Sequence, residues 1–156
     1  YAIGGVSVGE SRKTVQEIVS FTTPLLPEDK PRYLMGVGRP EEIVSAVQAG
    51  VDMFDCVIPT REARHGRLYY FVSPRTKSSV KLFHNLAYKT LHIRNSRYVR
   101  DFSAINADSK VDSLQCYSKA YLRHLLNIEE GLGYRLATLH NLEFYLRLMQ
   151  ELRESM

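Results

Sequence analysis

Asp55 is the residue whose surroundings point most directly to chemistry. It lies inside the apolar run Met53 to Ile58 (MFDCVI), and such a run predicts a short strand covered on both faces, ended by Pro59. A carboxylate in a buried strand is costly unless it is paired or functional. Two interpretations stay open from these residues alone: a reactive carboxylate, or a structural one that caps backbone amides.

A strongly basic segment follows Asp55. From Arg61 to Arg100 the sequence has seven Arg and three Lys against one acidic residue, although the whole chain carries a net charge of only +4. Aromatic residues are interleaved with these charges. This pattern fits a surface that meets phosphates and bases. A solvated basic face is the alternative.

Strands and helices must position these groups, and the first 60 residues alternate between them. The pattern predicts a strand end near Ile3, a helix over 14–21, a strand over 33–38, a helix from Pro40 to Gly50 and a strand over 51–58. This alternation is typical of parallel α/β architecture, in which functional groups gather where strands end. We therefore expect Gly5, Met35, Gly36 and Asp55 to line one pocket mouth.

The remaining chain predicts two further regions. Residues 67–112 form a basic region rich in β structure and loops, and residues 113–156 form helices over 113–128 and 136–154, separated by a break at Gly131 and Gly133. The parallel α/β region that precedes both comprises residues 1–66. The predicted apolar stripe of the last helix is Leu139, Leu142, Leu146, Met149 and Leu152.

The bulk composition limits the classes of protein. With 156 residues and 44% hydrophobic residues the chain can build a core. No apolar run approaches the roughly 20 residues of a membrane span. Cys56 and Cys116 lie in apolar settings, which indicates reduced thiols and a cytoplasmic location. The sequence opens with Tyr1 at a strand end rather than with Met, so we expect the C-terminal part of a longer protein.

Several motifs together resemble the bacterial tRNA-guanine transglycosylases. They are YAIGGVSVGE at 1–10, PRYLMGVG at 31–38, GVDMFDCVIPTR at 50–61, HIRN at 92–95, SKAYLRHL at 118–125 and HNL at 140–142. The resemblance covers nearly the whole chain, apart from an apparent insertion near 74–90. It implies the C-terminal portion of a (β/α)8 TIM barrel, with an inserted basic β-rich subdomain and C-terminal helices.

The resemblance also implies an activity and a set of site residues. The wobble guanine of the tRNA anticodon would be exchanged for a 7-deazaguanine base, with Asp55 as the nucleophile that holds the ribose covalently. Arg61 and Arg64 would grip anticodon-loop phosphates. A valine at position 8 favours the small precursor base over queuine. The implied base-binding residues are Gly5, Val6, Ser7, Val8, Glu10, Met35 and Gly36.

A metal site of the family is not matched. The resemblance implies a structural zinc held by Cys-x-Cys-x-x-Cys and a later His, but Ser109, Val111 and Leu114 stand at the three cysteine positions. Only His140 matches, and Cys116 lies two residues beyond the third position. One His and one Cys cannot make a four-ligand site. We predict no zinc and no other cofactor.

The expected partners are the tRNA anticodon loop and a 7-deazaguanine base, with no membrane. The family's acid/base aspartate and purine-reading residues belong to an N-terminal half outside this sequence, so this chain alone would lack a complete active site. The alternative function is a catalytically silent tRNA-binding or partner subunit of the same superfamily. Pairing as a homodimer stays open.

Overall fold

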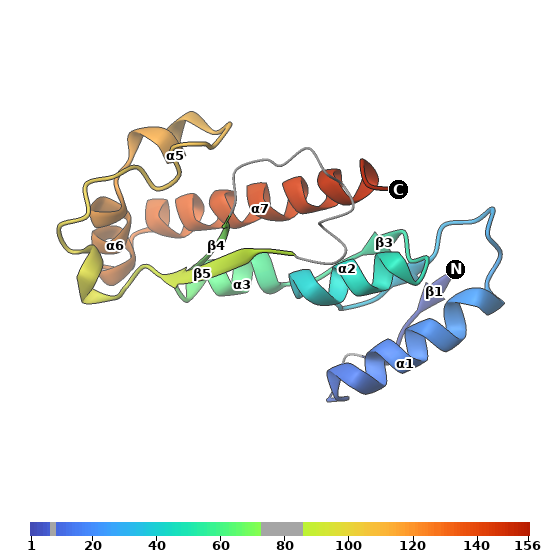
Figure 1. Ribbon diagram of the computed structural model, residues 1–156. Helices are drawn as coiled ribbons and strands as arrows, with labels where there is room; N and C mark the ends of the chain where they lie inside the picture. Colours follow the sequence, from blue (N-terminus) through green and yellow to red (C-terminus); the bar gives the residue numbers. More distant parts are fainter. Residues whose placement is uncertain (7–8, 73–85) are drawn as a thin grey trace. The chain divides into compact units, whose positions relative to one another are not determined.

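The protein is described here from a computed structural model, in which residues 1–6, 9–72 and 86–156 are described (Figure 1). Ser7, Val8 and most of the insertion expected near 74–90 lie outside this part of the chain. The fold is mixed α/β, with one small parallel and one small antiparallel sheet. Two compact units divide the described residues: one holds Tyr1–Ile58 and Gln150–Met156, and the other holds residues 59–72 and Ala87–Met149.

The first unit is built on a three-stranded parallel sheet in the order β1-β2-β3. The strands are β1 (Ala2–Ile3), β2 (Tyr33–Leu34) and β3 (Met53–Phe54). Helix α1 (Arg12–Thr22) and the 3-10 turn η1 (Thr23–Leu25) follow β1, and helix α2 (Pro40–Gln48) joins β2 to β3. The predicted alternation of strand and helix is therefore present in this unit.

Local sequence signals explain both helices of this unit. The hydroxyl of Ser11 accepts a hydrogen bond from the Thr14 amide at 3.2 Å and so caps α1. Pro40 occupies the first turn of α2 with two glutamates, where the helix dipole favours negative charge. Arg12 of α1 forms an ion pair with Glu41 of α2 at 3.2 Å. The core beneath them consists of Ile3, Val6, Val19, Leu34, Val37, Ala46 and Val51.

The prediction of a buried strand over 51–58 around Asp55 is wrong in its length and burial. Strand β3 comprises only two residues, and helix α3 (Ile58–Arg64) begins soon after it. Pro59 does not end a strand but lies in the first helical turn, which its fixed φ angle suits. Met53 and Val57 are 50% and 59% exposed, because β3 is an edge strand with one neighbour in the described sheet.

The second unit combines a hairpin with helices. Strand β4 (Arg67–Phe71) pairs antiparallel with β5 (Tyr88–His92). The 3-10 turn η2 (Ser96–Tyr98) follows, and then helices α5 (Asp112–Cys116), α6 (Lys119–Asn127) and α7 (Gly131–Arg153). The core of this unit is Ala63, Leu68, Leu91, Ile93, Tyr98, Ile105, Leu114, Leu122, Leu125, Leu126, Leu136 and Ala137.

Two predicted helix boundaries in this unit are wrong. The single helix expected over 113–128 is interrupted, because Ser118 caps α6 by accepting a hydrogen bond from the Tyr121 amide at 3.1 Å. The glycines expected to break the chain lie inside α7. Gly133 allows a close approach instead: a Cβ there would lie 2.8 Å from the Cβ of Leu125 in α6.

The predicted apolar stripe of α7 is only partly correct: Leu152 is 1% exposed and Leu139 packs against the core of the second unit. Leu142 and Leu146 are 38% and 70% exposed, whereas His140 and Asn141 are buried. The Asn141 side chain is fully bonded to backbone: its amide nitrogen donates to the carbonyls of Pro59 at 3.0 Å and Arg67 at 2.9 Å, and its oxygen accepts from the Tyr69 amide at 3.2 Å. Asn141 therefore ties α7 to α3 and β4.

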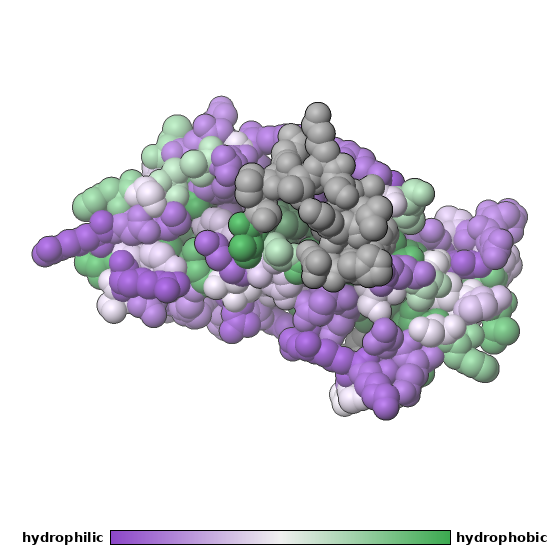
Figure 2. Space-filling view, in the orientation of Figure 1, coloured by the Kyte–Doolittle hydropathy of each residue, from purple (hydrophilic) through white to green (hydrophobic). Residues whose placement is uncertain are grey.

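The surface carries both polar and apolar residues. Figure 2 shows hydrophilic residues over much of the visible face, with hydrophobic surface at the end of α1. Phe21 and Leu25, at the end of α1 and in η1, are 75% and 69% exposed. Among the helices of the described ranges, none combines the length and apolar character needed to cross a membrane.

Candidate active site

Asp55 lies at the carboxyl end of the parallel sheet, next to residues of the neighbouring strand. The Tyr33 hydroxyl donates to Asp55 Oδ1 at 2.6 Å, and the Gly36 amide donates to the same oxygen at 3.0 Å. The register explains this arrangement, because Tyr33 pairs with Met53 and side chains two residues apart point to the same face. Strand β2 and the residues that directly follow it therefore hold Oδ1 of Asp55.

These two donors stabilise the ionised form of the carboxylate. Hydrogen bonding from Tyr33, and then from the Gly36 amide, lowers the pKa of Asp55 below its ordinary value of 3.8. The same bond raises the pKa of the Tyr33 hydroxyl. Asp55 is exposed rather than buried. Direct hydrogen bonds, rather than desolvation, therefore have the larger effect on its pKa. At neutral pH Asp55 is an accessible, negatively charged group with nucleophilic oxygens.

Met35 directly precedes Gly36, one of the two donors to Asp55, and contacts the glycine turn that follows β1. A Cβ at Gly4 would lie 3.0 Å from Sδ of Met35, so the turn after β1 and the turn after β2 are in close contact. Gly5 and Gly36 have φ angles of 74° and 75°, a region that favours glycine. Met35 is 46% exposed. Of the predicted pocket residues, the structure therefore gathers Met35, Gly36 and Asp55 at one sheet edge, with the Gly4–Gly5 turn against Met35.

The structure supports a position beside Asp55 less directly for the other predicted base-binding residues. Val6 is 6% exposed and belongs to the core of the first unit. Glu10 is exposed and precedes α1. Ser7 and Val8 are not among the described residues. The backbone that the prediction assigned to base recognition is therefore described only up to Val6.

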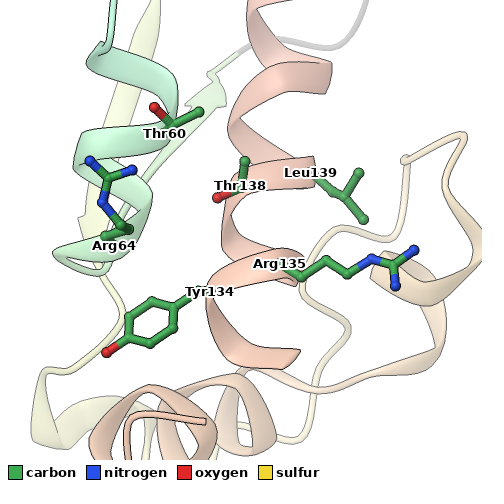
Figure 3. Close-up of a pocket in the computed structure, with 6 residues that line it drawn as sticks. All are labelled: Thr60, Arg64, Tyr134, Arg135, Thr138 and Leu139. Carbon is green, nitrogen blue, oxygen red and sulfur yellow. The ribbon is translucent and has the colours of Figure 1, made fainter. Parts of the chain in front are cut away.

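Arg61 and Arg64 belong to the second unit and lie on helix α3. Arg61 is 3.9 Å from the Glu62 carboxylate, which also forms an ion pair with Arg67 at 3.0 Å. Arg64 lines a cavity of about 310 Å³ between α3 and α7, together with Thr60 and Tyr134 (Figure 3). Figure 3 also shows Arg135, a further lining residue of this cavity, directed away from Arg64.

Tyr33 is the site residue that the sequence interpretation missed. Its role depends on strand pairing, because only the β2–β3 register brings its hydroxyl to Asp55, 22 positions later. The available signal was its spacing: Tyr33 is two residues before Met35, and alternate residues of a strand share a face. In the described part of the chain, no group of three or more His, Cys, Asp or Glu side chains is arranged to hold a metal ion.

A fold of parallel strands with a carboxylate held at their carboxyl ends belongs to the α/β class of enzymes and binding proteins. The family model described as "Queuine tRNA-ribosyltransferase" matches residues 1–156. The chain belongs to this family.

Curated relatives carry the same description. The queuine tRNA-ribosyltransferase of Haemophilus ducreyi is 47% identical over 155 residues, which cover 99% of this chain and 36% of the relative. Those of Actinobacillus succinogenes and Shouchella clausii are 48% and 46% identical, over 99% of this chain and 37% and 36% of the relatives. The chain thus spans little more than a third of the length of these relatives.

Proposed function

We propose that this chain is the C-terminal part of a tRNA-guanine transglycosylase and that Asp55 is its nucleophile. The observation that carries the proposal is the setting of Asp55: an exposed carboxylate whose Oδ1 accepts bonds from Tyr33 and the Gly36 amide. The family membership of the whole chain supports the same assignment. A carboxylate kept ionised and accessible is suited to attack on a sugar carbon.

The reaction proceeds in two displacements. A carboxylate oxygen of Asp55 attacks C1′ of the wobble nucleotide as the C1′–N9 bond to guanine breaks, and the departing guanine takes up a proton. The incoming 7-deazaguanine base then loses a proton and attacks C1′, which releases the Asp55 carboxylate. Two partial steps of this kind replace one difficult displacement. The proton transfers require an acid/base group in the remaining part of the protein.

The base would bind at the turns beside Asp55. Met35, half-exposed next to the Gly4–Gly5 turn, would contact the base face, and the backbone from Gly5 to Ser7 would bond its polar edge, oriented by Glu10. Glycine at 5 and 36 permits the positive φ angles of these turns. The valine at position 8 would favour the small precursor base over queuine.

The tRNA would meet the exposed basic groups of helix α3. Arg61 and Arg64 are exposed at the last turn of this helix, where they would neutralise anticodon-loop phosphates. The barrel would be completed by the remaining part of the protein. Strand β3 has an open edge in the described sheet, and Phe21 is 75% exposed, as expected of surfaces that pack against further strands and helices.

The test is base exchange by the full-length protein that carries this sequence. The protein is incubated with labelled guanine and its substrate tRNA. Incorporation of the label into the tRNA is compared for the parent protein, Asp55→Asn and Asp52→Asn. Asp52 is an exposed aspartate of the same segment whose carboxylate accepts a hydrogen bond from the Arg32 amide at 2.8 Å, so it is the matched control. We expect loss of incorporation for Asp55→Asn alone.

Two outcomes would contradict the proposal in different ways. No incorporation by the parent protein would favour a catalytically silent tRNA-binding subunit, an alternative that the three replaced cysteine positions support. Equal incorporation by the parent and Asp55→Asn would remove Asp55 from the nucleophile role. Trapping of a tRNA–protein adduct by the parent, but not by Asp55→Asn, would support the covalent intermediate directly.

A further inference from the structure

The family resemblance implies a structural zinc in the second unit, and the residues of this chain do not fit one. The four implied positions are Ser109, Val111, Leu114 and His140. Leu114 is fully buried in the core of the unit and Val111 packs against that core, so neither offers a ligand atom. A structural zinc is normally held by four sulfur or nitrogen ligands. Only His140 remains as a conventional donor.

His140 is already engaged elsewhere by one of its ring nitrogens. Its Nε2 lies 2.8 Å from the Tyr69 carbonyl oxygen, and the ring packs on Tyr70 with centroids 4.3 Å apart. Its other nitrogen, Nδ1, is buried with no hydrogen-bond partner. A carbonyl acceptor at Nε2 places the proton on that nitrogen and leaves Nδ1 as an unused acceptor. His140 therefore acts as a packed side chain of α7 that is bonded to β4.

Glu143, a carboxylate one turn further along α7, binds the loop that carries Ser109. The Ser109 hydroxyl donates to Glu143 Oε2 at 2.6 Å, and the Lys110 amide donates to Oε1 at 2.6 Å. Both oxygens of Glu143 thus bind the loop that precedes α5. Hydrogen bonds to an ionised acceptor are about twice as strong as those between neutral groups.

Hydrogen bonds within the loop also stabilise it around Ser109. The Val111 amide donates to the Ser109 hydroxyl oxygen at 2.9 Å, and the Gln115 side chain donates to the Ser109 carbonyl at 2.6 Å. The Asn106 amide donates to the Leu114 carbonyl at 2.9 Å. Ser109 is 4% exposed, so these bonds satisfy polar groups that burial would otherwise penalise.

We propose that Glu143 and Ser109 replace the metal: together they fasten the loop of residues 106–115 to α7, and this part of the protein folds without zinc. The Glu143–Ser109 clamp uses a hydroxyl at one former ligand position, and Leu114 fills another with packed hydrocarbon. This inference goes beyond the proposed function, since none of its contacts involves Asp55 or the base pocket.

The first test measures metal directly on the purified full-length protein that carries this sequence. Elemental analysis should give zinc well below one atom per chain, and the melting temperature should not change when EDTA is added. Tyrosine near-ultraviolet circular dichroism can report the melting, because the second unit packs several tyrosines together. Stoichiometric zinc, or a melting temperature that falls with EDTA, would overturn the proposal. These measurements need no variant.

The second test removes the clamp from each side. Glu143→Gln keeps the side-chain shape but sets an NH₂ group against a donor, and Ser109→Ala removes the bridging hydroxyl. Each should lower the melting temperature by about 3–6 °C, and the double variant should lose less than the sum because both act on one bond. Glu154→Gln, in the exposed turn that follows α7, is the matched control.

The variants separate a clamp from an ordinary surface contact. If Glu143→Gln melts like Glu154→Gln, or if the losses from Glu143→Gln and Ser109→Ala simply add, the clamp does not exist. Should Glu143→Gln fail to fold, Ser109→Ala still tests the same bond with a smaller change. Base exchange is not the readout, so these results stand whether or not the transferase assignment holds.

Discussion

Protonation of His140 should make the second unit sensitive to acid. The imidazole is 2% exposed, and desolvation by burial lowers its pKa from 6.5 to about 4 despite the bond to the Tyr69 carbonyl. Because the folded pKa is depressed, the neutral ring is favoured by folding. Its stabilising effect is complete above pH 6.5 and is lost progressively as the pH falls from 6.5 toward 4.

The magnitude follows from the two pKa values. For an unfolded pKa of 6.5 and a folded pKa of about 4, linkage gives a loss of about 2 kcal/mol in the free energy of unfolding between pH 7 and pH 5. This is a large fraction of the roughly 5–15 kcal/mol that stabilises a typical domain. The other histidines in the described ranges, His65, His92 and His124, are exposed.

Urea unfolding at pH 7 and pH 5, followed by tyrosine circular dichroism, measures the loss. The control is His140→Gln, whose amide can donate to the same carbonyl but cannot titrate; its stability should fall less between the two pH values by about 2 kcal/mol. The ring signals of His140 in NMR give the pKa itself. The reasoning is refuted if these signals titrate near pH 6.5, or if His140→Gln shows the same pH dependence as the parent.

Three further substitutions test other contacts. Tyr33→Phe removes the main cause of the lowered Asp55 pKa, so the acid limb of base exchange by the full-length protein should move to higher pH; an unchanged limb would contradict this. Asn141→Leu removes three hydrogen bonds to backbone groups and should cost on the order of 3 kcal/mol in urea unfolding; a loss below 1 kcal/mol would contradict it. Gly133→Ala places a Cβ 2.8 Å from α6 and should lower the melting temperature, whereas Gly131→Ala meets no atom within 4 Å and should maintain or raise it. Equal melting temperatures for the two alanine variants would refute the packing argument.

Asp55 illustrates how far the sequence leads toward the site. Its place near the end of a predicted strand indicated its position at the edge of the sheet, because parallel strands end together. Its partner Tyr33 could not be predicted in the same way. That contact depends on the register between β2 and β3, which the sequence of either strand alone does not determine. The burial of Asp55 was also mispredicted, because β3 lies at a sheet edge.

Helix α7 shows why its buried face was misjudged. Leucines at helical spacing predicted the stripe, but Leu142 and Leu146 are exposed while His140 and Asn141 are buried. The Asn141 side chain is bonded to backbone groups 72 to 82 positions earlier in the chain. A polar residue is stable inside a core when distant backbone groups satisfy it. Hydrophobic periodicity contains no information about such partners.

The replaced zinc positions that the family resemblance implies lie in one unit, and the groups that surround Asp55 lie in the other. The clamp joins Ser109 to Glu143 in the second unit. The groups that lower the Asp55 pKa, Tyr33 and the Gly36 amide, both lie in the first unit. Replacement of the metal positions therefore leaves the donors to Asp55 in place. A subunit that had lost catalysis would have no need to keep an exposed carboxylate ionised by a dedicated hydroxyl and amide, so the replaced cysteine positions do not by themselves establish loss of activity.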